Sequence, residues 1–324
     1  MAAPALQALV HSMRLEADRI VSVELRPNGD GAAFPAFTPG SHVDLHLPNG
    51  LVRSYSLCNP SSDRNRYVIA VLEERNSRGG SRYVHQQLRV GQAIAISMPR
   101  NNFALRDDAP RSVLVAGGIG ITPLLCMLEH LVALRRPAEL VCCARSRREA
   151  AFVDVVEAWQ GQVRITWHFD EERGGPPDLA AMLQGRGADT DYYCCGPAPM
   201  LDAFERACRL LEAPRVHIER FAGAVFEPGA ETEGWAFEVV CEKSGKSVRV
   251  RGDQSVLDAL IDAGIDADHS CKEGICGACE TRVLGFDGAL DHRDGILTSM
   301  ERQAGKSMMI CVSRCIGRQL VLDI

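Results

Sequence analysis

Hydrophobic and polar residues alternate with a period of two over short runs in the first third of the chain, as in residues 21–25, 42–47 and 67–71. Turns with Pro, Asn and Gly, such as Pro48-Asn49-Gly50, separate the runs. This alternation is typical of strands that bury one face, and closely spaced turns between such strands favour a closed antiparallel sheet. Residues 1–105 are therefore predicted to form a small antiparallel β-barrel.

After Pro110 the pattern changes to an apolar strand at 113–116, a glycine loop and an apolar helical stretch that continues to Leu134. Strands and helices that alternate in this way imply a parallel sheet with helices on both faces, and such sheets bind ligands at the carboxyl ends of their strands. Residues 106–221 are predicted to form an α/β nucleotide domain. Further strands are expected at 139–144, 163–169 and 192–195, and helices at 149–160 and 199–211.

The last part of the chain begins with residues 222–235, which are rich in Ala, Gly, Glu and Pro and are predicted to be a linker. Runs at 237–240 and 248–250 predict a hairpin, and residues 255–264 predict a short helix. Residues 236–324 are therefore predicted to form an α+β domain.

Composition and charge limit the possible classes of protein. A chain of 324 residues with 46% hydrophobic residues is long enough for three cores, and a net charge of −6 without a basic stripe argues against a nucleic-acid surface. No run of 18 apolar residues and no basic residue ahead of the apolar N-terminal stretch occur, so neither a membrane span nor a signal peptide is expected. The odd number of cysteines, thirteen, indicates mostly reduced thiols and a cytoplasmic protein.

Four cysteines carry the strongest chemical signal. Cys271, Cys276 and Cys279 are separated by four and two residues, and Cys311 follows at a distance. This is the plant-type ferredoxin spacing, in which four thiolates hold a 2Fe-2S cluster, and the small residues between the ligands leave room for it. A zinc site is the alternative, but zinc sites usually pair two short C-x2-C units.

Two motifs in the predicted barrel have the chemistry that a flavin needs. Arg53, Tyr55 and Ser56 offer a cation, an aromatic plane and a hydroxyl. Gly79, Gly80 and Ser81 offer an anion-binding turn for a phosphate. An amphipathic strand followed by a glycine-rich hairpin turn explains the same residues without a ligand.

The glycine loop of the second domain departs from the G-x-G-x-x-G dinucleotide pattern, because Pro123 stands at its third glycine. The loop would still allow a ligand to approach its backbone closely, and it leads into a helix N-terminus for which Thr122 is the expected cap. A second wall of the same crevice is expected from the end of the last long apolar strand. A capping turn plus a buried thiol is the alternative for these residues, which are Gly117, Gly118, Gly120, Thr122, Cys195, Gly196 and Pro197.

A nicotinamide nucleotide gives up two electrons as a hydride, a 2Fe-2S cluster accepts one electron at a time, and a flavin can do both. The motifs described above, in this order along the chain, resemble the phthalate dioxygenase reductase family, the reductase components of Rieske oxygenases. The resemblance extends to residues 65–71, 291–294 and 311–314 and covers nearly the whole chain. It implies a flavin barrel, a ferredoxin-reductase-like nucleotide domain and a β-grasp ferredoxin domain. It also implies FMN rather than FAD, NADH as electron donor, and an oxygenase partner that receives single electrons from a monomeric reductase.

Family roles carried onto matching positions place Arg53, Tyr55, Ser56, Gly80 and Ser81 at FMN, with Gly79 beside them. They place Gly118, Gly120, Thr122, Cys195 and Gly196 at the nucleotide, flanked by Gly117 and Pro197, and make Ser56 and Cys195 the candidate catalytic residues. The resemblance implies that Phe221 lies near the flavin, either stacked on it or simply packed. Cys315 is expected to be a spectator thiol.

Three questions stay open at the level of sequence. Arg145-Ser146-Arg147-Arg148 follows the second strand of the nucleotide domain, where a basic residue permits NADPH, although a solvated turn is the simpler explanation. A free-standing flavin or acceptor reductase and a cluster-based redox sensor are alternatives to an oxygenase reductase. The substrate of the partner, an aromatic acid such as phthalate or vanillate or an amine such as carnitine, is not encoded in this chain.

Overall fold

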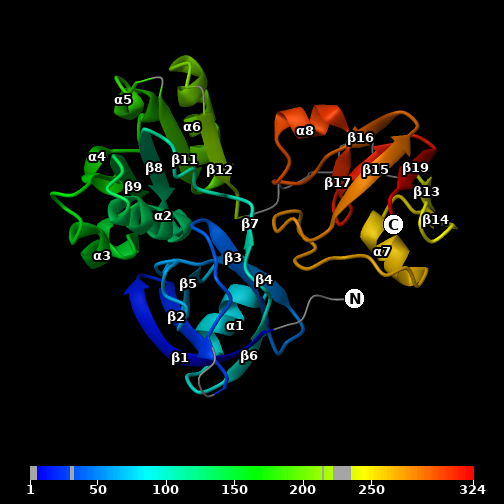
Figure 1. The fold of residues 1–324 in the computed structure, drawn as a ribbon, viewed down its shortest axis with the longest axis horizontal. Coiled ribbons are helices and arrows are strands. Elements are labelled where there is room, and N and C mark those ends of the chain that lie inside the picture. Colours follow the sequence, from blue (N-terminus) through cyan, green and yellow to red (C-terminus); the bar gives the residue numbers. More distant parts are fainter. Residues whose placement is uncertain (1–5, 30–32, 188, 214, 222–234) are drawn as a thin grey trace. The chain divides into compact units, whose positions relative to one another are not determined.

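The computed structural model describes residues 6–29, 33–187, 189–213, 215–221 and 235–324, and divides into two compact units (Figure 1). One unit spans Ala3–Phe221 and the other contains Ala222–Ile324. Except for Trp235, the predicted linker at 222–235 lies outside the described residues.

The N-terminal part of the first unit is an antiparallel barrel with strand order β4-β3-β6-β1-β2-β5, and β7 pairs with β3. A bridge between Leu57 and Ile69 joins the two ends of this order and closes the sheet. Helix α1 buries Tyr83 and Val84 in the barrel core. The predicted barrel is confirmed. Its elements are β1 (Leu6–Ala17), β2 (Ile20–Pro27), β3 (Ser41–His46), β4 (Val52–Ser56), β5 (Tyr67–Leu72), α1 (Gly80–Gln86), β6 (Ala93–Ile96) and β7 (Arg100–Asn101).

Strand β1 was not predicted from the sequence. Its pairing with β2 shifts register between Val10 and Ser12 and again between Leu15 and Ala17. Each irregularity moves the following side chains to the other face, so hydrophobic residues do not recur with a period of two.

The rest of the first unit is a five-stranded parallel sheet with the order β10-β9-β8-β11-β12. Helix α2 covers one face, and α5 and α6 cover the other, each over its own hydrophobic core. The elements are β8 (Arg111–Gly117), η1 (Gly118–Gly120), α2 (Ile121–Ala133), β9 (Ala138–Ala144), η2 (Arg147–Glu149), α3 (Val153–Glu157), β10 (Arg164–Phe169), α4 (Asp170–Arg173), α5 (Leu179–Leu183), β11 (Thr190–Cys195), α6 (Ala198–Leu210) and β12 (Arg215–Glu219).

The parallel sheet is confirmed, whereas the helix predicted at 149–160 is wrong for most of its length. Ala150 has an extended backbone and Phe152 a left-handed one with φ 60°, so that the α-helix is limited to Val153–Glu157. A left-handed non-glycine residue interrupts the helical hydrogen-bond pattern.

The second unit is an α+β domain with a mixed sheet of order β14-β13-β19-β15-β17. Strand β13 pairs antiparallel with β14 and parallel with β19, and α7 packs Val256, Leu257 and Leu260 into the core beside the sheet. The Ser255 hydroxyl caps α7 by accepting from the Asp258 N–H. The α+β prediction is confirmed. The elements are β13 (Phe237–Cys241), β14 (Lys246–Val250), α7 (Val256–Asp262), β15 (Glu280–Phe286), β16 (Ala289–Asp291), α8 (Ser299–Ala304), β17 (Ser307–Met309), β18 (Arg314–Ile316) and β19 (Gln319–Leu322).

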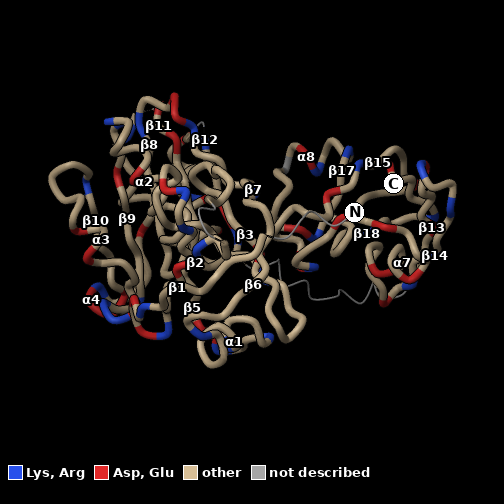
Figure 2. The backbone as a smooth tube through the Cα atoms, turned by 60° about the horizontal axis from the view of Figure 1, so that its bottom comes forward, with Lys and Arg blue, Asp and Glu red and all other residues tan. Residues whose placement is uncertain are grey.

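Acidic and basic residues are interspersed along both units (Figure 2). None of the helices in the described part of the chain is long and apolar enough to cross a membrane.

Candidate functional site

Strand β4 presents the residues predicted to bind a flavin. Ser54 lies on the face of the strand opposite to Arg53 and Tyr55, where its hydroxyl donates to Asp44 Oδ1 at 2.6 Å. Arg53 crosses Gly80 so closely that a Cβ on Gly80 would lie 2.6 Å from Arg53 Cγ. The glycine requirement at position 80 therefore comes from the arginine side chain.

Gly79 and Gly80 open a helix and do not form a hairpin turn. Gly79 is the N-cap of α1 with φ 98°, a left-handed conformation that favours glycine. The Ser81 hydroxyl accepts from the Glu74 N–H at 3.1 Å and lies 2.9 Å from the Ser77 hydroxyl oxygen, so it also braces the preceding loop. The structure thus brings Gly79 and Gly80 beside Arg53, where an anion can meet a cation and a helix N-terminus.

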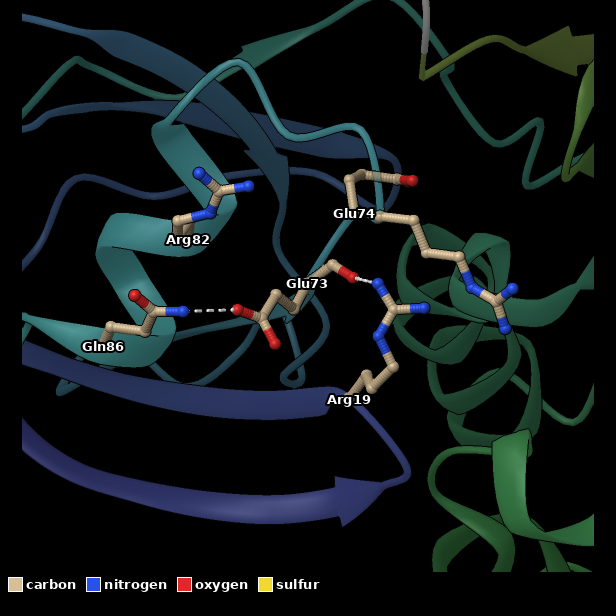
Figure 3. Close-up of a pocket in the computed structure, with 6 residues that line it drawn as sticks. Arg19, Glu73, Glu74, Arg82 and Gln86 are labelled. Carbon is tan, nitrogen blue, oxygen red and sulfur yellow. Dashed lines mark hydrogen bonds between the residues drawn. The ribbon is translucent and has the colours of Figure 1, made fainter.

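A charged pocket lies on the outer side of α1 (Figure 3). Gln86 Nε2 donates to Glu73 Oε1 at 3.0 Å, and the Arg19 guanidinium donates to the Glu73 carbonyl oxygen. None of the residues predicted to bind a cofactor lines this pocket, which is formed by Arg19, Glu73, Glu74, Arg75, Arg82 and Gln86.

The glycine loop between β8 and α2 packs directly on the residues that follow β11. A Cβ on Gly120 would lie 2.2 Å from the Cys195 carbonyl oxygen, and one on Gly117 would lie 2.8 Å from Pro197 Cδ. The two loops therefore form adjoining walls at the carboxyl edge of the sheet, as predicted. Gly118, with φ 53° and open space around its Cα, leaves its backbone accessible.

The predicted capping role of Thr122 is wrong. Gly120 occupies the N-cap of α2, and the Thr122 hydroxyl donates to the Ile119 carbonyl oxygen at 3.0 Å. The 3₁₀ turn η1 leads directly into α2, so the helix begins two residues earlier than a hydroxyl cap at Thr122 would require.

Ser56 and Cys195, the two candidate catalytic residues, converge on the carboxyl group of Glu219. Strand β12 ends at Glu219, which is the register partner of Cys195 on β11. Ser56 reaches it from the barrel, its hydroxyl donating to Glu219 Oε2 at 3.4 Å. Burial raises the pKa of Glu219 to about 8, because a carboxylate loses hydration there, and burial also raises the pKa of the Cys195 thiol. Both shifts favour the neutral forms, a protonated Glu219 and an uncharged Cys195 thiol.

Sequence reasoning missed Glu219. The signal that was present is a carboxyl group directly after the apolar strand that ends the sheet, at the edge where ligands bind. Two residues later Phe221 is 37% exposed, so its ring is only partly packed.

The four predicted cluster ligands lie in two pairs. Cys279 Sγ and Cys311 Sγ are 3.1 Å apart. The Cys276 thiol donates to Cys271, whose sulfur also accepts from the Glu273 N–H at 3.3 Å, and these bonds lower the pKa of Cys271 to about 6. Each iron of a 2Fe-2S cluster takes two thiolates, so two pairs fit a two-iron cluster.

The loop that carries three of these cysteines depends on glycine and on a neighbouring segment. Gly274 has φ 69°, and a Cβ there would lie 2.7 Å from Val312 Cγ2 and 3.2 Å from Asp294 Cα. The Gly295 N–H donates to the Gly274 carbonyl oxygen at 2.9 Å. Asp294, the last residue of the family pattern at 291–294, and Gly295 thus brace the cluster loop. Cys315 lies elsewhere, with its sulfur 3.4 Å from the Asp287 carbonyl oxygen, as expected for a spectator.

Two family models match the chain. Residues 239–315 match the 2Fe-2S iron-sulfur cluster binding domain, and residues 114–206 match the oxidoreductase NAD-binding domain. The first match covers all four paired cysteines, and the second covers both walls at the carboxyl edge of the parallel sheet.

Similar proteins extend over nearly the whole chain. Phenoxybenzoate dioxygenase subunit beta of Ectopseudomonas oleovorans is 43% identical over 97% of this chain and 96% of its own length. Tetrachlorobenzoquinone reductase of Sphingobium chlorophenolicum is 44% identical over 94% of each chain. Vanillate O-demethylase oxidoreductase of Pseudomonas sp. (strain HR199 / DSM 7063) is 41% identical over 98% of this chain and 100% of its own.

Solved structures agree with these relatives. An intact type IV self-sufficient cytochrome P450 monooxygenase matches 100% of this chain with a TM-score of 0.87 and 39% identity, and this chain spans 42% of that longer one. Phthalate dioxygenase reductase, described as a modular structure for electron transfer from pyridine nucleotides to [2Fe-2S], matches 99% of this chain and 98% of its own with a TM-score of 0.72 and 36% identity. This chain therefore belongs to the phthalate dioxygenase reductase family, as an oxidoreductase with a flavin-binding barrel, an NAD-binding α/β domain and a 2Fe-2S ferredoxin domain.

Proposed function

We propose that this protein oxidises NADH, transfers the hydride to FMN at the barrel, and passes single electrons through its 2Fe-2S cluster to the terminal component of an oxygenase. The convergence of Ser56, Cys195 and Glu219 is the observation that carries this proposal, because it joins predicted flavin and nucleotide residues at one carboxyl group. When bound, the flavin supplies the exchange between two-electron and one-electron chemistry.

The residues of this site act by position and by charge. Ser56 offers a hydroxyl at the barrel side, which faces Glu219 Oε2 at 3.4 Å. A protonated Glu219 keeps a negative charge away from a centre that accepts a hydride. Cys195, which is fully buried, adds a small side chain beside Glu219 on the neighbouring strand.

The proposed binding sets follow the predicted motifs. The cluster takes Cys271, Cys276, Cys279 and Cys311. The nucleotide lies along Gly117, Gly118, Gly120, Thr122, Cys195, Gly196 and Pro197. FMN takes Arg53, Tyr55, Ser56, Gly79, Gly80 and Ser81, with Phe221 beside it. The domain boundaries proposed for these sites are 1–105, 106–221 and 236–324, joined by the linker at 222–235.

The partner is proposed from the relatives. Phenoxybenzoate dioxygenase and vanillate O-demethylase, as named, act on aromatic acids, which supports an oxygenase for an aromatic acid over one for an amine such as carnitine. We also propose that the protein is a cytoplasmic monomer. All thirteen cysteines are free thiols in the structure, which fits a reducing compartment.

A second candidate function is supported by one relative. Tetrachlorobenzoquinone reductase is 44% identical to this chain, and its name describes direct reduction of a small acceptor. For that activity the protein needs no partner oxygenase.

An anaerobic titration with NADH, followed by visible absorption and electron paramagnetic resonance, tests the proposal. We expect bleaching of the flavin bands together with the signal of a reduced 2Fe-2S cluster. Bleaching of the flavin without reduction of the cluster would favour the quinone reductase. If neither NADH nor NADPH bleached the flavin, the reductase function would be ruled out.

The variant Cys276→Ser separates the two electron transfers. We expect loss of one-electron transfer to a protein acceptor such as cytochrome c, while NADH still reduces the flavin, because the hydride site lies in the other compact unit. Cys315→Ser is the matched control, a buried thiol outside the two pairs, and should keep both activities. Equal loss of both activities in Cys276→Ser would contradict the proposal that reduction of the flavin by NADH does not depend on the cluster.

A further inference from the structure

Two oppositely charged turns meet beside the parallel sheet. Turn η2 follows β9, and α4 follows β10. Arg147 Nε donates to Glu172 Oε1 at 2.6 Å, and Arg147 Nη2 donates to Glu172 Oε2 at 3.2 Å. The guanidinium also lies over the Phe169 ring, 4.5 Å from its centroid. A forked ion pair and a stacked ring fix this arginine although its side chain is 68% exposed.

Both turns emerge at the edge of the sheet that carries the glycine loop. Strands β9 and β10 are parallel, with Ala144 opposite Phe169 at their carboxyl ends. A small cleft lined by Gly118, Ala144 and Trp167, among others, connects this place to the glycine loop. Trp167 stacks on Phe169 with 5.6 Å between the ring centroids, and among the described residues its buried indole N–H has no hydrogen-bond partner.

The position of Arg147 has a known consequence for nucleotide choice. In dinucleotide-binding α/β folds, the residue that follows the second strand meets the 2′ position of the adenosine ribose. An acidic residue there accepts hydrogen bonds from the ribose hydroxyls, whereas an arginine holds the 2′-phosphate of NADPH. In this chain Arg147 follows the second strand, and the acidic residue bonded to it, Glu172, follows the next strand, β10.

We infer that Glu172 selects NADH over NADPH, because it holds Arg147 on Phe169 and cancels its charge. This inference rests on the proposed placement of the nucleotide. The Nε and Nη2 edge of the guanidinium is already occupied, so a 2′-phosphate would have to displace a carboxylate to reach it. The ribose hydroxyls of NADH need no such displacement.

The surrounding charges act in the same direction. The segments 145–149 and 170–173 together carry four basic and four acidic side chains, so a phosphate finds no net positive charge there (Figure 2). The eight residues are Arg145, Arg147, Arg148, Arg173, Glu149, Asp170, Glu171 and Glu172.

The variant Glu172→Gln tests the inference in the full chain with flavin and cluster bound. Glutamine keeps the shape of the side chain but removes its charge, so Arg147 becomes available to a phosphate. We expect the ratio of kcat/KM for NADPH to that for NADH to rise about tenfold, and the affinity for 2′,5′-ADP relative to 5′-AMP to rise by about the same factor.

Two controls make the result specific. Glu171→Gln removes the same charge from the same helix without releasing Arg147, and should change either ratio by less than about twofold. The double variant Arg147→Ala, Glu172→Gln should lose the gain, because no guanidinium remains to hold the phosphate.

Unchanged ratios in Glu172→Gln, an equal rise in Glu171→Gln, or a gain that persists without Arg147 would each overturn the inference. The binding assay does not depend on hydride transfer. If the unmodified protein oxidised neither nucleotide, the proposed function would fail, and the comparison of 2′,5′-ADP with 5′-AMP would still decide whether Glu172 excludes the phosphate.

Discussion

The Glu219 carboxyl group shows how a single side chain couples protonation to stability. Its neighbours are the neutral hydroxyl of Ser56 and the neutral thiol of Cys195, and none of these supplies a positive charge. The folded protein therefore favours the neutral acid and raises the pKa to about 8, whereas an unfolded chain returns the carboxyl to its usual value near 4.5.

The sign of the pH dependence follows from this difference. Between about pH 4.5 and pH 8 the folded state binds more protons at Glu219 than the unfolded state, so the contribution of this group to stability falls as the pH rises. For Glu219→Gln we expect no such fall, so that relative to the variant the wild type loses roughly 1–3 kcal/mol of unfolding free energy between pH 5 and pH 9.

Urea unfolding of both proteins with saturating flavin at the two pH values measures this difference. A difference between wild type and variant that is constant over this range would mean that Glu219 is ionised in the folded protein. A difference that changes in the opposite direction would mean that an unrecognised cation stabilises the carboxylate.

At the scale of elements, the cluster loop between α7 and β15 has little regular structure and depends on backbone conformation. Gly274 meets two requirements at once, a left-handed φ and a close approach of Val312 and Asp294. Gly264, just after α7, meets only the first, since no other atom lies within 4 Å of its ideal Cβ position. Substitution of each glycine by alanine therefore separates the free-energy cost of a left-handed backbone from the cost of a steric clash.

Gly274→Ala is expected to destroy cluster binding, because the added methyl group displaces Val312 or residue 294 and with them the loop that presents Cys271 and Cys276. Gly264→Ala should cost only about 1 kcal/mol of stability and keep the cluster. Iron content and visible absorption after purification measure both effects. A normal cluster in Gly274→Ala would show that the loop can shift without loss of its ligands.

The elements also show where sequence patterns suffice. Strands β8 to β11 and helix α6 were predicted closely, because buried parallel strands and an amphipathic helix have strong patterns. Strand β1 and helix α3 were missed or misjudged, because register shifts and a left-handed Phe152 leave no periodic signature. For the site, motif residues were found one at a time, whereas the bonds of Glu219 and Glu172 depend on contacts between distant segments.

At the scale of the whole molecule, the barrel and the parallel sheet belong to one compact unit and the ferredoxin domain to another. Ile20, Ala70 and Phe103, from the barrel and the segment after it, lie in the same hydrophobic core as Leu114 and Leu124 of the α/β part. A shared core means that these two parts stabilise each other.

A chain that ends at Phe221 is therefore expected to fold, bind flavin and accept a hydride from NADH at a rate within about threefold of the full protein, while transfer to a one-electron protein acceptor is lost. Stopped-flow absorption and thermal unfolding measure the two properties. Loss of flavin binding by the shortened chain would mean that the ferredoxin domain completes the flavin site.

The bond between Ser56 and Glu219 joins residues that are 163 positions apart in the sequence, and it decides which pieces of this reductase can be exchanged. A chimera that took its barrel from one relative and its nucleotide domain from another would have to preserve this contact, because Ser56 comes from the barrel and Glu219 from the nucleotide domain. An exchange made after Phe221 leaves the bond between Ser56 and Glu219 intact. The barrel and the parallel sheet should thus be exchanged together, as one unit. The ferredoxin domain is the part that can be replaced on its own to match a different electron acceptor.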